Sequence, residues 1–161
     1  MIISSTEFKN NDFLKKEHEF NEFGGNGNNR SPELAWADAP VETKSFAITA
    51  YDPDAPTGSG FWHWVVFDIP AETQTLPANA GRSDSSKLPI NAIQSRNDYG
   101  KPGFGGLCPP VGDKAHRYIF TVHALSVEKL GIDSDVTNAI ARFMIQANTL
   151  ASATITGYYQ R

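Results

Sequence analysis

The chain has little of what would tie it to secretion, to a membrane or to nucleic acid. Its 161 residues include one cysteine, so no internal disulfide can form and the framework of a small secreted domain is missing. The first twenty residues mix charged and apolar side chains, and no later apolar run is long enough to span a bilayer. A net charge of -4 argues against nucleic acid or an anionic membrane as the main partner. These absences predict a cytoplasmic protein without stable membrane insertion.

Signatures of catalysis are also missing. The sequence has no Gly-rich phosphate loop ahead of a helix and no Gly-x-Ser-x-Gly nucleophile elbow. Cys108 is the one thiol, and no local base or helix N-terminus is present that would activate it. No repeat or linker divides the chain. We therefore expect a single domain over residues 1–161 that is not an enzyme and needs no cofactor.

Strand patterns dominate what is present. Strands are predicted for residues 45–51, 62–69, 117–125 and 153–159. The second and third of these are almost continuously apolar, which is typical of strands buried on both faces. Residues 21–33 and 77–113 are rich in Gly, Asn, Pro and Ser and predict loops, with a short strand near Ile93.

One helix is predicted, starting at Ser134 with a cap from residues 133–135. Apolar side chains then recur at helical spacing and should form the face that packs on the core. This predicted apolar stripe comprises Val136, Ile140, Phe143, Ala147 and Leu150, and the predicted polar face carries Asn138, Arg142 and Gln146. The fold class predicted from the residues is mostly β with one or two peripheral helices.

Polar side chains gather in three proline-rich segments. Asp52 and Asp54 stand in the stiff run Asp-Pro-Asp-Ala-Pro, and His63 opens an apolar strand where its ring needs a partner. His116 and Tyr118 are two positions apart at the start of a strand, so they leave the same face and can share a pocket. Polar side chains grouped in this way bind a ligand more often than they lie on a surface without a function.

Simpler interpretations stand beside this one. The two aspartates could form an ordinary Asx turn, and His63 could be a satisfied core histidine. His63, His116 and Asp52 could also be written as a two-histidine, one-carboxylate metal site, but the spacing is unspecific and we expect no metal. His123 lies an odd number of positions from His116 and should face away from it. His123 and His18 are both interpreted as structural.

Five ordered motifs carry a family resemblance. They are DPDAP at 52–56, HW at 63–64, GKPGFGG at 100–106, CPPVG at 108–112 and HRYIFTVHAL at 116–125. Together they resemble the phosphatidylethanolamine-binding protein family, in its bacterial Raf kinase inhibitor-like branch. SPELAW at 31–36 and LASATITGYY at 150–159 extend the resemblance over nearly the whole chain.

The resemblance implies a large central antiparallel sheet packed on a smaller one, with a shallow pocket for phosphate-like anions at one end. The residues that it places in this pocket are Asp52, Pro56, His63, Cys108 through its backbone, His116 and Tyr118. Loop support is expected from Asp54, Trp64, Pro109 and Pro110. The sequence departs from the family pattern in two places. Leu107 stands where bacterial relatives often have proline. The C-terminal helix of mammalian members is not found after the last predicted strand, which argues against binding of an intact lipid.

The expected function is therefore the binding of a phospholipid headgroup, a phosphorylated small molecule or a phosphorylated side chain. Family members that inhibit kinases or proteases suggest a protein partner as the alternative, and a homodimer stays open. A metal-dependent or Cys/His hydrolase is the third class. Anion affinity should fall through roughly pH 6 to 8 if both imidazoles donate to the ligand near their ordinary pKa. A cis peptide is expected at Ser59–Gly60, where neighbouring glycines would ease its steric conflicts.

Overall fold

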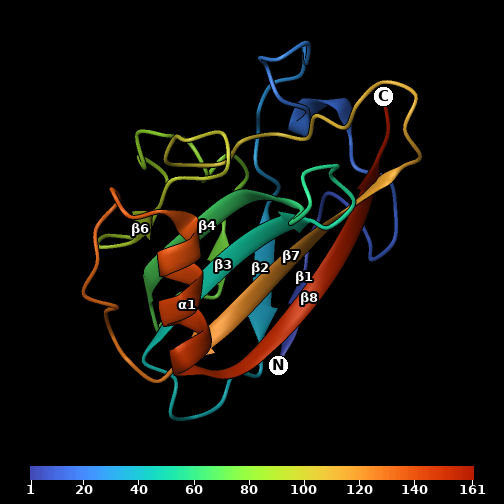
Figure 1. Ribbon diagram of the computed structural model, residues 1–161. Coiled ribbons are helices and arrows are strands. Elements are labelled where there is room, and N and C mark those ends of the chain that lie inside the picture. The colour runs from blue at the N-terminus through green and yellow to red at the C-terminus, as the bar shows by residue number, and fades with distance from the viewer.

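The computed structural model describes residues 1–161 (Figure 1). It contains two antiparallel sheets. The larger sheet has the strand order β6-β4-β3-β7-β8. Its strands are β3 (Ser45–Asp52), β4 (Phe61–Pro70), β6 (Ile93–Gln94), β7 (His116–Leu125) and β8 (Thr149–Tyr159). The smaller sheet contains β1 (Ile2–Ser4), β2 (Leu34–Ala37) and β5 (Thr75–Leu76) in the order β1-β2-β5. The predicted fold class, a large central sheet packed on a smaller one, is confirmed.

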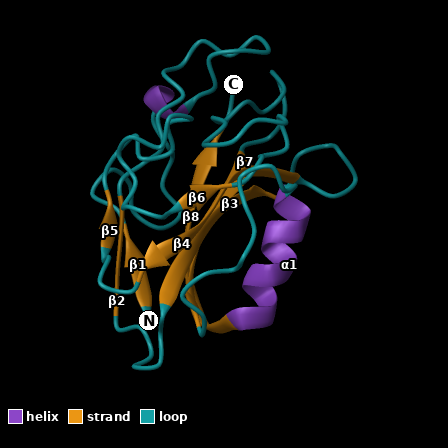
Figure 2. Cartoon of the chain, turned by 90° about the vertical axis from the view of Figure 1, so that its left-hand side faces the viewer, coloured by secondary structure: helices purple, strands orange, loops and turns teal.

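The larger sheet lies between the smaller sheet and the α-helix (Figure 2). Along β4, Trp64 and Val66 pack toward the smaller sheet in the main core, whereas Val65 and Phe67 pack in a second cluster on the helix side. This alternation follows from the period of two in a strand. The prediction that the segment at 62–69 is buried on both faces is therefore correct.

The same prediction is only half right for β7. Tyr118, Phe120 and Val122 are buried in the main core. On the opposite face Arg117 is exposed, and Ile119 and Thr121 are only partly buried. The apolar run therefore predicted burial of both faces, although only one face of β7 is fully covered. The other face is partly exposed because helix α1 covers only part of the sheet.

Helix α1 (Asn138–Asn148) begins later than predicted and packs on the opposite face. Its cap is Thr137, whose side chain accepts a hydrogen bond from the Ile140 backbone N–H. The buried residues of the helix are Asn138, Ala141 and Ile145. Of the predicted apolar stripe, Ile140 is 50% exposed and Phe143 is 72% exposed, while Leu150 already belongs to β8. The predicted packing face is therefore wrong.

Polar anchors explain this orientation of α1. The Asn138 side-chain amide donates to Asp98 Oδ1 at 2.8 Å, and Arg142 Nε donates to Asn138 Oδ1 at 3.1 Å. The Arg142 guanidinium lies 3.9 Å from the centre of the Trp62 ring. A charged side chain over an indole ring is attracted by it, and its methylene stem covers apolar surface. The face that packs on the sheet thus combines these polar anchors with the apolar Ala141 and Ile145.

The remaining chain is mostly loop, as predicted for residues 77–113, where β6 is the one short strand and isolated bridges form at Arg96, Pro102 and Leu107. The three strands of the smaller sheet were not predicted individually from the residues. The structure has no cis peptide bond, so the expectation at Ser59–Gly60 is wrong. Gly60 instead has φ +74, a conformation that glycine adopts without strain. Helix α1 has 11 residues, and no helix is long and apolar enough to cross a bilayer.

Candidate functional site

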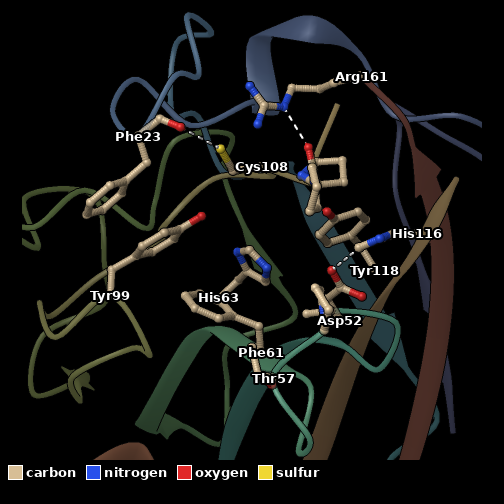
Figure 3. A pocket seen from close by; sticks show the side chains of 14 residues that line it. Phe23, Asp52, Thr57, Phe61, His63, Tyr99, Cys108, His116, Tyr118 and Arg161 are labelled. Carbon is tan, nitrogen blue, oxygen red and sulfur yellow. Dashed lines mark hydrogen bonds and ion pairs between the residues drawn. The ribbon is translucent and has the colours of Figure 1, made fainter. Parts of the chain in front are cut away.

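A cavity of about 240 Å³ opens beside the ends of β3, β4 and β7 (Figure 3). Asp52 is the last residue of β3, His116 is the first of β7, and His63 is the third of β4. In the sheet register Asp52 pairs with Phe61, so the antiparallel strands bring these ends to one edge. The 14 lining residues are Phe23, Asp52, Ala55, Pro56, Thr57, Phe61, His63, Tyr99, Cys108, Pro109, Pro110, His116, Tyr118 and Arg161. All six residues predicted to contact a ligand line this cavity.

His116 lies between two carboxylates. Its Nδ1 is 2.7 Å from Asp52 Oδ2 and its Nε2 is 2.9 Å from Asp113 Oδ2. Burial lowers the pKa of His116, but the hydrogen bonds to Asp52 and Asp113 outweigh that effect and raise the pKa above its usual value. The ring is therefore a cation over a wider pH range than a free histidine. Both of its nitrogens are already engaged, so the expectation that His116 has a donor free for a ligand is not met while Asp113 stays in place.

The two aspartates of the Asp-Pro-Asp run have different tasks. Asp52 Oδ1 accepts from the Asp54 backbone N–H at 2.8 Å, which closes the Asx turn weighed above as the simpler interpretation. The Asp54 carboxylate accepts from the Arg117 backbone N–H and from its guanidinium at 2.8–3.0 Å. These hydrogen bonds from Arg117 lower the pKa of Asp54. Asp54 thus holds the loop, as expected, and Arg117 faces away from the cavity.

His63 is a buried base that points into the cavity (Figure 3). Its Nδ1 lies 2.7 Å from the Gly105 carbonyl oxygen, which can only accept, so Nδ1 carries the proton. Burial lowers the pKa of His63, which favours the neutral ring and leaves Nε2 as an acceptor. The Gly105 carbonyl therefore orients this ring, whereas the Asp52 carboxylate binds His116.

Tyr118 brings a phenol to the same cavity. Its ring centre is 5.3 Å from that of His63, and its hydroxyl is buried without a hydrogen bond of normal geometry in the protein. Burial, followed by the charge of Asp52 and a weak contact with its carboxylate, raises the pKa of Tyr118, so the hydroxyl keeps its proton as a donor. Trp64 lies one position beyond His63 on the core side, where its Nε1 donates to Gln94 Oε1 at 2.7 Å. Trp64 packs in the main core beneath the strand, and its predicted part in supporting a loop stays a prediction.

Cys108 and the two prolines after it form one wall. The thiol Sγ lies 3.7 Å from the Phe23 carbonyl oxygen, and burial raises its pKa. Such a sulfur stays a thiol at neutral pH and is a poor nucleophile. Arg161 Nε donates to the Pro109 carbonyl at 2.7 Å, which fixes the guanidinium beside this wall. Pro109 and Pro110 therefore line the cavity themselves as well as stiffening the loop.

Several lining residues were missed. Phe23, Phe61 and Tyr99 form an aromatic side, with Tyr99 and Phe61 ring centres 4.6 Å apart. Arg161 adds the one guanidinium that lines the cavity. Phe61 and Tyr99 stand beside motifs already recognised, so adjacency was a usable signal. Phe23 and Arg161 are distant in sequence and gave none.

Comparisons with known proteins agree with this geometry. A sequence profile described as "PBP: Phosphatidylethanolamine-binding protein" matches residues 4–160. The chain is 52% identical over 158 residues to UPF0098 protein YbcL of Escherichia coli K12, covering 98% of this chain and 86% of YbcL. It is 47% identical to YbhB of the same strain over 159 residues, covering 99% of each.

Solved structures of this family have the same fold. The crystal structure of E. coli YbcL, described as a new member of the mammalian PEBP family, superposes with a TM-score of 0.97 and covers 99% of this chain and 97% of that one. A Chlamydia trachomatis PEBP homologue at 26% identity has a TM-score of 0.82, with 99% of this chain and 97% of that one covered. The motifs, the two sheets and the profile match agree, and the chain belongs to the phosphatidylethanolamine-binding protein family, among relatives that include the bacterial proteins YbcL and YbhB.

Proposed function

We propose that the protein is a non-enzymatic binding module whose cavity takes a phosphate-like anion, carried by a small molecule, a headgroup or a phosphorylated side chain. The observation that carries the proposal is the Tyr118 hydroxyl, a buried donor that makes no hydrogen bond of normal geometry and has only a weak contact with Asp52. A buried polar group that lacks a hydrogen bond costs free energy until something supplies one. An anion oxygen at this position would accept from it.

The charges around the cavity suit an anion despite the carboxylate of Asp52. The His116 ring bridges Asp52 and Asp113, and its raised pKa keeps a positive charge beside Asp52. Arg161 adds a guanidinium, and only its Nε and Nη1 are used by the hydrogen bonds to Pro109 and Gly24. Charge-assisted hydrogen bonds to an anion are stronger than neutral ones. The apolar and aromatic lining around these groups would limit competition from water.

A binding role is favoured over catalysis by the state of the candidate nucleophile. The Cys108 thiol has a raised pKa, and its contact is a backbone carbonyl rather than a base. His116, which would be the obvious base, has both ring nitrogens hydrogen bonded to carboxylates. An activated nucleophile needs a free base within hydrogen-bond reach. The free nitrogen of the cavity, His63 Nε2, makes no hydrogen bond to the Cys108 thiol, which contacts the Phe23 carbonyl instead.

Sulfate tests the proposal, because its charge is constant near neutral pH. We expect sulfate affinity to rise as pH falls below about 6.5, the ordinary histidine pKa, by up to about tenfold per pH unit for one coupled proton. Protonation converts His63 Nε2 from an acceptor into a donor, and the lowered pKa of His63 shifts this gain to more acidic pH than the window of pH 6 to 8 first expected.

Calorimetric titration of sulfate between about pH 7 and about pH 5 measures this gain. Repeating it in buffers of different ionisation enthalpy reports directly whether a proton is taken up. A constant affinity with no proton uptake would remove His63 from the site. Absence of sulfate or phosphate binding across the range would reject the proposed function.

Asp113→Ala should raise sulfate affinity, by roughly three- to tenfold. Asp113 is 41% exposed at its side chain and places a negative charge on His116 Nε2, where an anion oxygen could otherwise bind. Removing it frees that donor and removes a repulsive charge. The comparison is Asp84→Ala, which deletes an exposed carboxylate outside this cavity, and the same calorimetric titration measures both. Equal affinity in Asp113→Ala and the unaltered protein would show that His116 does not reach the ligand.

A further inference from the structure

Three side chains outside the cavity form a compact cluster of metal-ligand type. Glu7 lies in the loop after β1, and Glu17 and His18 belong to the 3-10 helix η1 (Lys16–His18). One ligand atom from each of the three lies within 4.8 Å of the others. The sequence indicated nothing here, since His18 was interpreted as structural and the two glutamates belong to a polar stretch.

The ring of His18 is oriented as a metal-binding histidine is. Its Nδ1 is 2.7 Å from the Arg30 carbonyl oxygen, which can only accept, so the proton of a neutral ring is on Nδ1. Metal-ligating histidines characteristically donate their second ring N–H to a carbonyl or carboxylate in this way. His18 is 1% exposed, and its other nitrogen, Nε2, is buried without a hydrogen-bond partner.

The near neighbour of His18 Nε2 is a carboxylate oxygen, which is an acceptor and not a donor: Glu17 Oε1 lies 3.9 Å away. A cation between this nitrogen and this oxygen would stabilise both. Ligands at about 2.0–2.2 Å from one tetrahedral zinc ion lie roughly 3.3 Å apart, so a small side-chain adjustment would suffice.

Arg30 supplies positive charge to the cluster in this structure. Its Nη1 contacts Glu7 Oε1 and lies 3.4 Å from Glu17 Oε2. The Arg30 side chain is 31% exposed, so its guanidinium has a route to solvent, while its backbone carbonyl still holds His18. Glu7 is fixed independently, because its other carboxylate oxygen accepts from the Glu33 backbone N–H.

We propose that Glu7, Glu17 and His18 form a binding site for a divalent transition-metal ion of the zinc class, which replaces the Arg30 guanidinium between the two carboxylates. One imidazole and two carboxylates are ligands that such ions accept, and water completes the coordination. The site is distinct from the anion cavity but is joined to its wall. The Leu107 backbone N–H donates to the His18 carbonyl at 3.0 Å, and Phe20 N donates to the Leu107 carbonyl at 2.9 Å.

That connection gives the ion a structural task. Leu107 precedes Cys108 in the cavity wall, and a proline at position 107 would lack the N–H that reaches His18. A bound ion would hold His18, and through it the segment that carries Cys108 and Pro109.

Calorimetric titration of Zn²⁺ into the full chain, in a buffer that does not chelate metals, tests the site. Glu17→Gln, at a side chain 35% exposed, should weaken zinc binding at least about tenfold, since loss of outer-shell partners alone costs that much. Arg30→Gln should strengthen it, because the competing cation is removed. Glu22→Gln is the matched control: it neutralises a carboxylate of the same N-terminal region that pairs with Lys101.

Circular dichroism of each variant verifies that the fold is retained, and Co²⁺ absorption separates this site from Cys108, since an oxygen and nitrogen site gives no thiolate charge-transfer band. Zinc binding that is weaker in Glu17→Gln, tighter in Arg30→Gln and unchanged in Glu22→Gln supports the proposal. Equal affinity in Glu17→Gln, a thiolate band with Co²⁺, or no binding at millimolar Zn²⁺ would overturn it. Weaker binding in Arg30→Gln would overturn the replacement of the guanidinium.

Discussion

Tyr118→Phe is expected to lower sulfate affinity about tenfold or more while leaving the free energy of unfolding unchanged or slightly raised. The Tyr118 hydroxyl is buried without a hydrogen bond of normal geometry, so the folded state loses only its weak contact with Asp52 when it is deleted. The complex, in contrast, loses a donor to a charged ligand, and such hydrogen bonds contribute about 1.5–3 kcal/mol. Calorimetric titration of sulfate and urea unfolding measure the two quantities on the same preparations.

Tyr159→Phe is the control with the opposite pattern. The Tyr159 hydroxyl donates to Glu19 Oε1 at 2.9 Å, and burial, followed by that contact, raises the pKa of Tyr159 to about 12. Tyr159 does not line the cavity. Its loss should therefore cost about 1–2 kcal/mol of stability and leave sulfate affinity unchanged. Saturable sulfate binding that survives Tyr118→Phe at full strength would show that the phenol does not contact the anion.

The contrast between these tyrosines shows what sequence alone could supply. Spacing places Tyr118 and His116 on one face of β7, because strand side chains alternate, and the structure confirms it. Spacing does not reveal which hydroxyl has a partner. Glu19, the partner of Tyr159, is far from it in sequence. Asp113, which contacts His116, lies in a loop, and sequence periodicity does not predict the conformation of a loop.

Helix α1 marks the corresponding limit for the fold. Hydrophobic periodicity assumes that apolar side chains face the core, and it predicted Ile140 and Phe143 there. The structure buries Ala141 and Ile145 instead and anchors this face through Asn138 and through the Arg142 guanidinium over the Trp62 ring. Strands of the larger sheet were predictable because their burial is set by alternation, whereas the short strands β1, β2 and β5 depend on pairing partners distant in sequence.

His123 should make this protein lose stability in mild acid. The side chain faces the helix side of β7, away from the anion cavity as predicted, and burial lowers its pKa to about 4. Its folded pKa lies below the unfolded value of about 6.5, so the unfolded state binds the proton more readily. Stability is fully present above about pH 6.5 and is lost as pH falls toward 4, by about 2.5 kcal/mol at about pH 4.5.

Urea unfolding of the unaltered protein and of His123→Gln, at about pH 7 and about pH 4.5, isolates this loss. Glutamine does not titrate, so the variant should lose about 2.5 kcal/mol less than the unaltered protein between the two conditions, whatever its stability at neutral pH. Other groups cancel in that difference. Asp54, whose lowered pKa also removes stability in acid, is present in both proteins, and the raised pKa of His116 acts at the alkaline end, where its contribution is lost as pH rises. If the variant lost as much stability in acid as the unaltered protein, His123 would take up a proton in the folded state. Water would then reach His123 through the groove that it lines between α1 and the larger sheet.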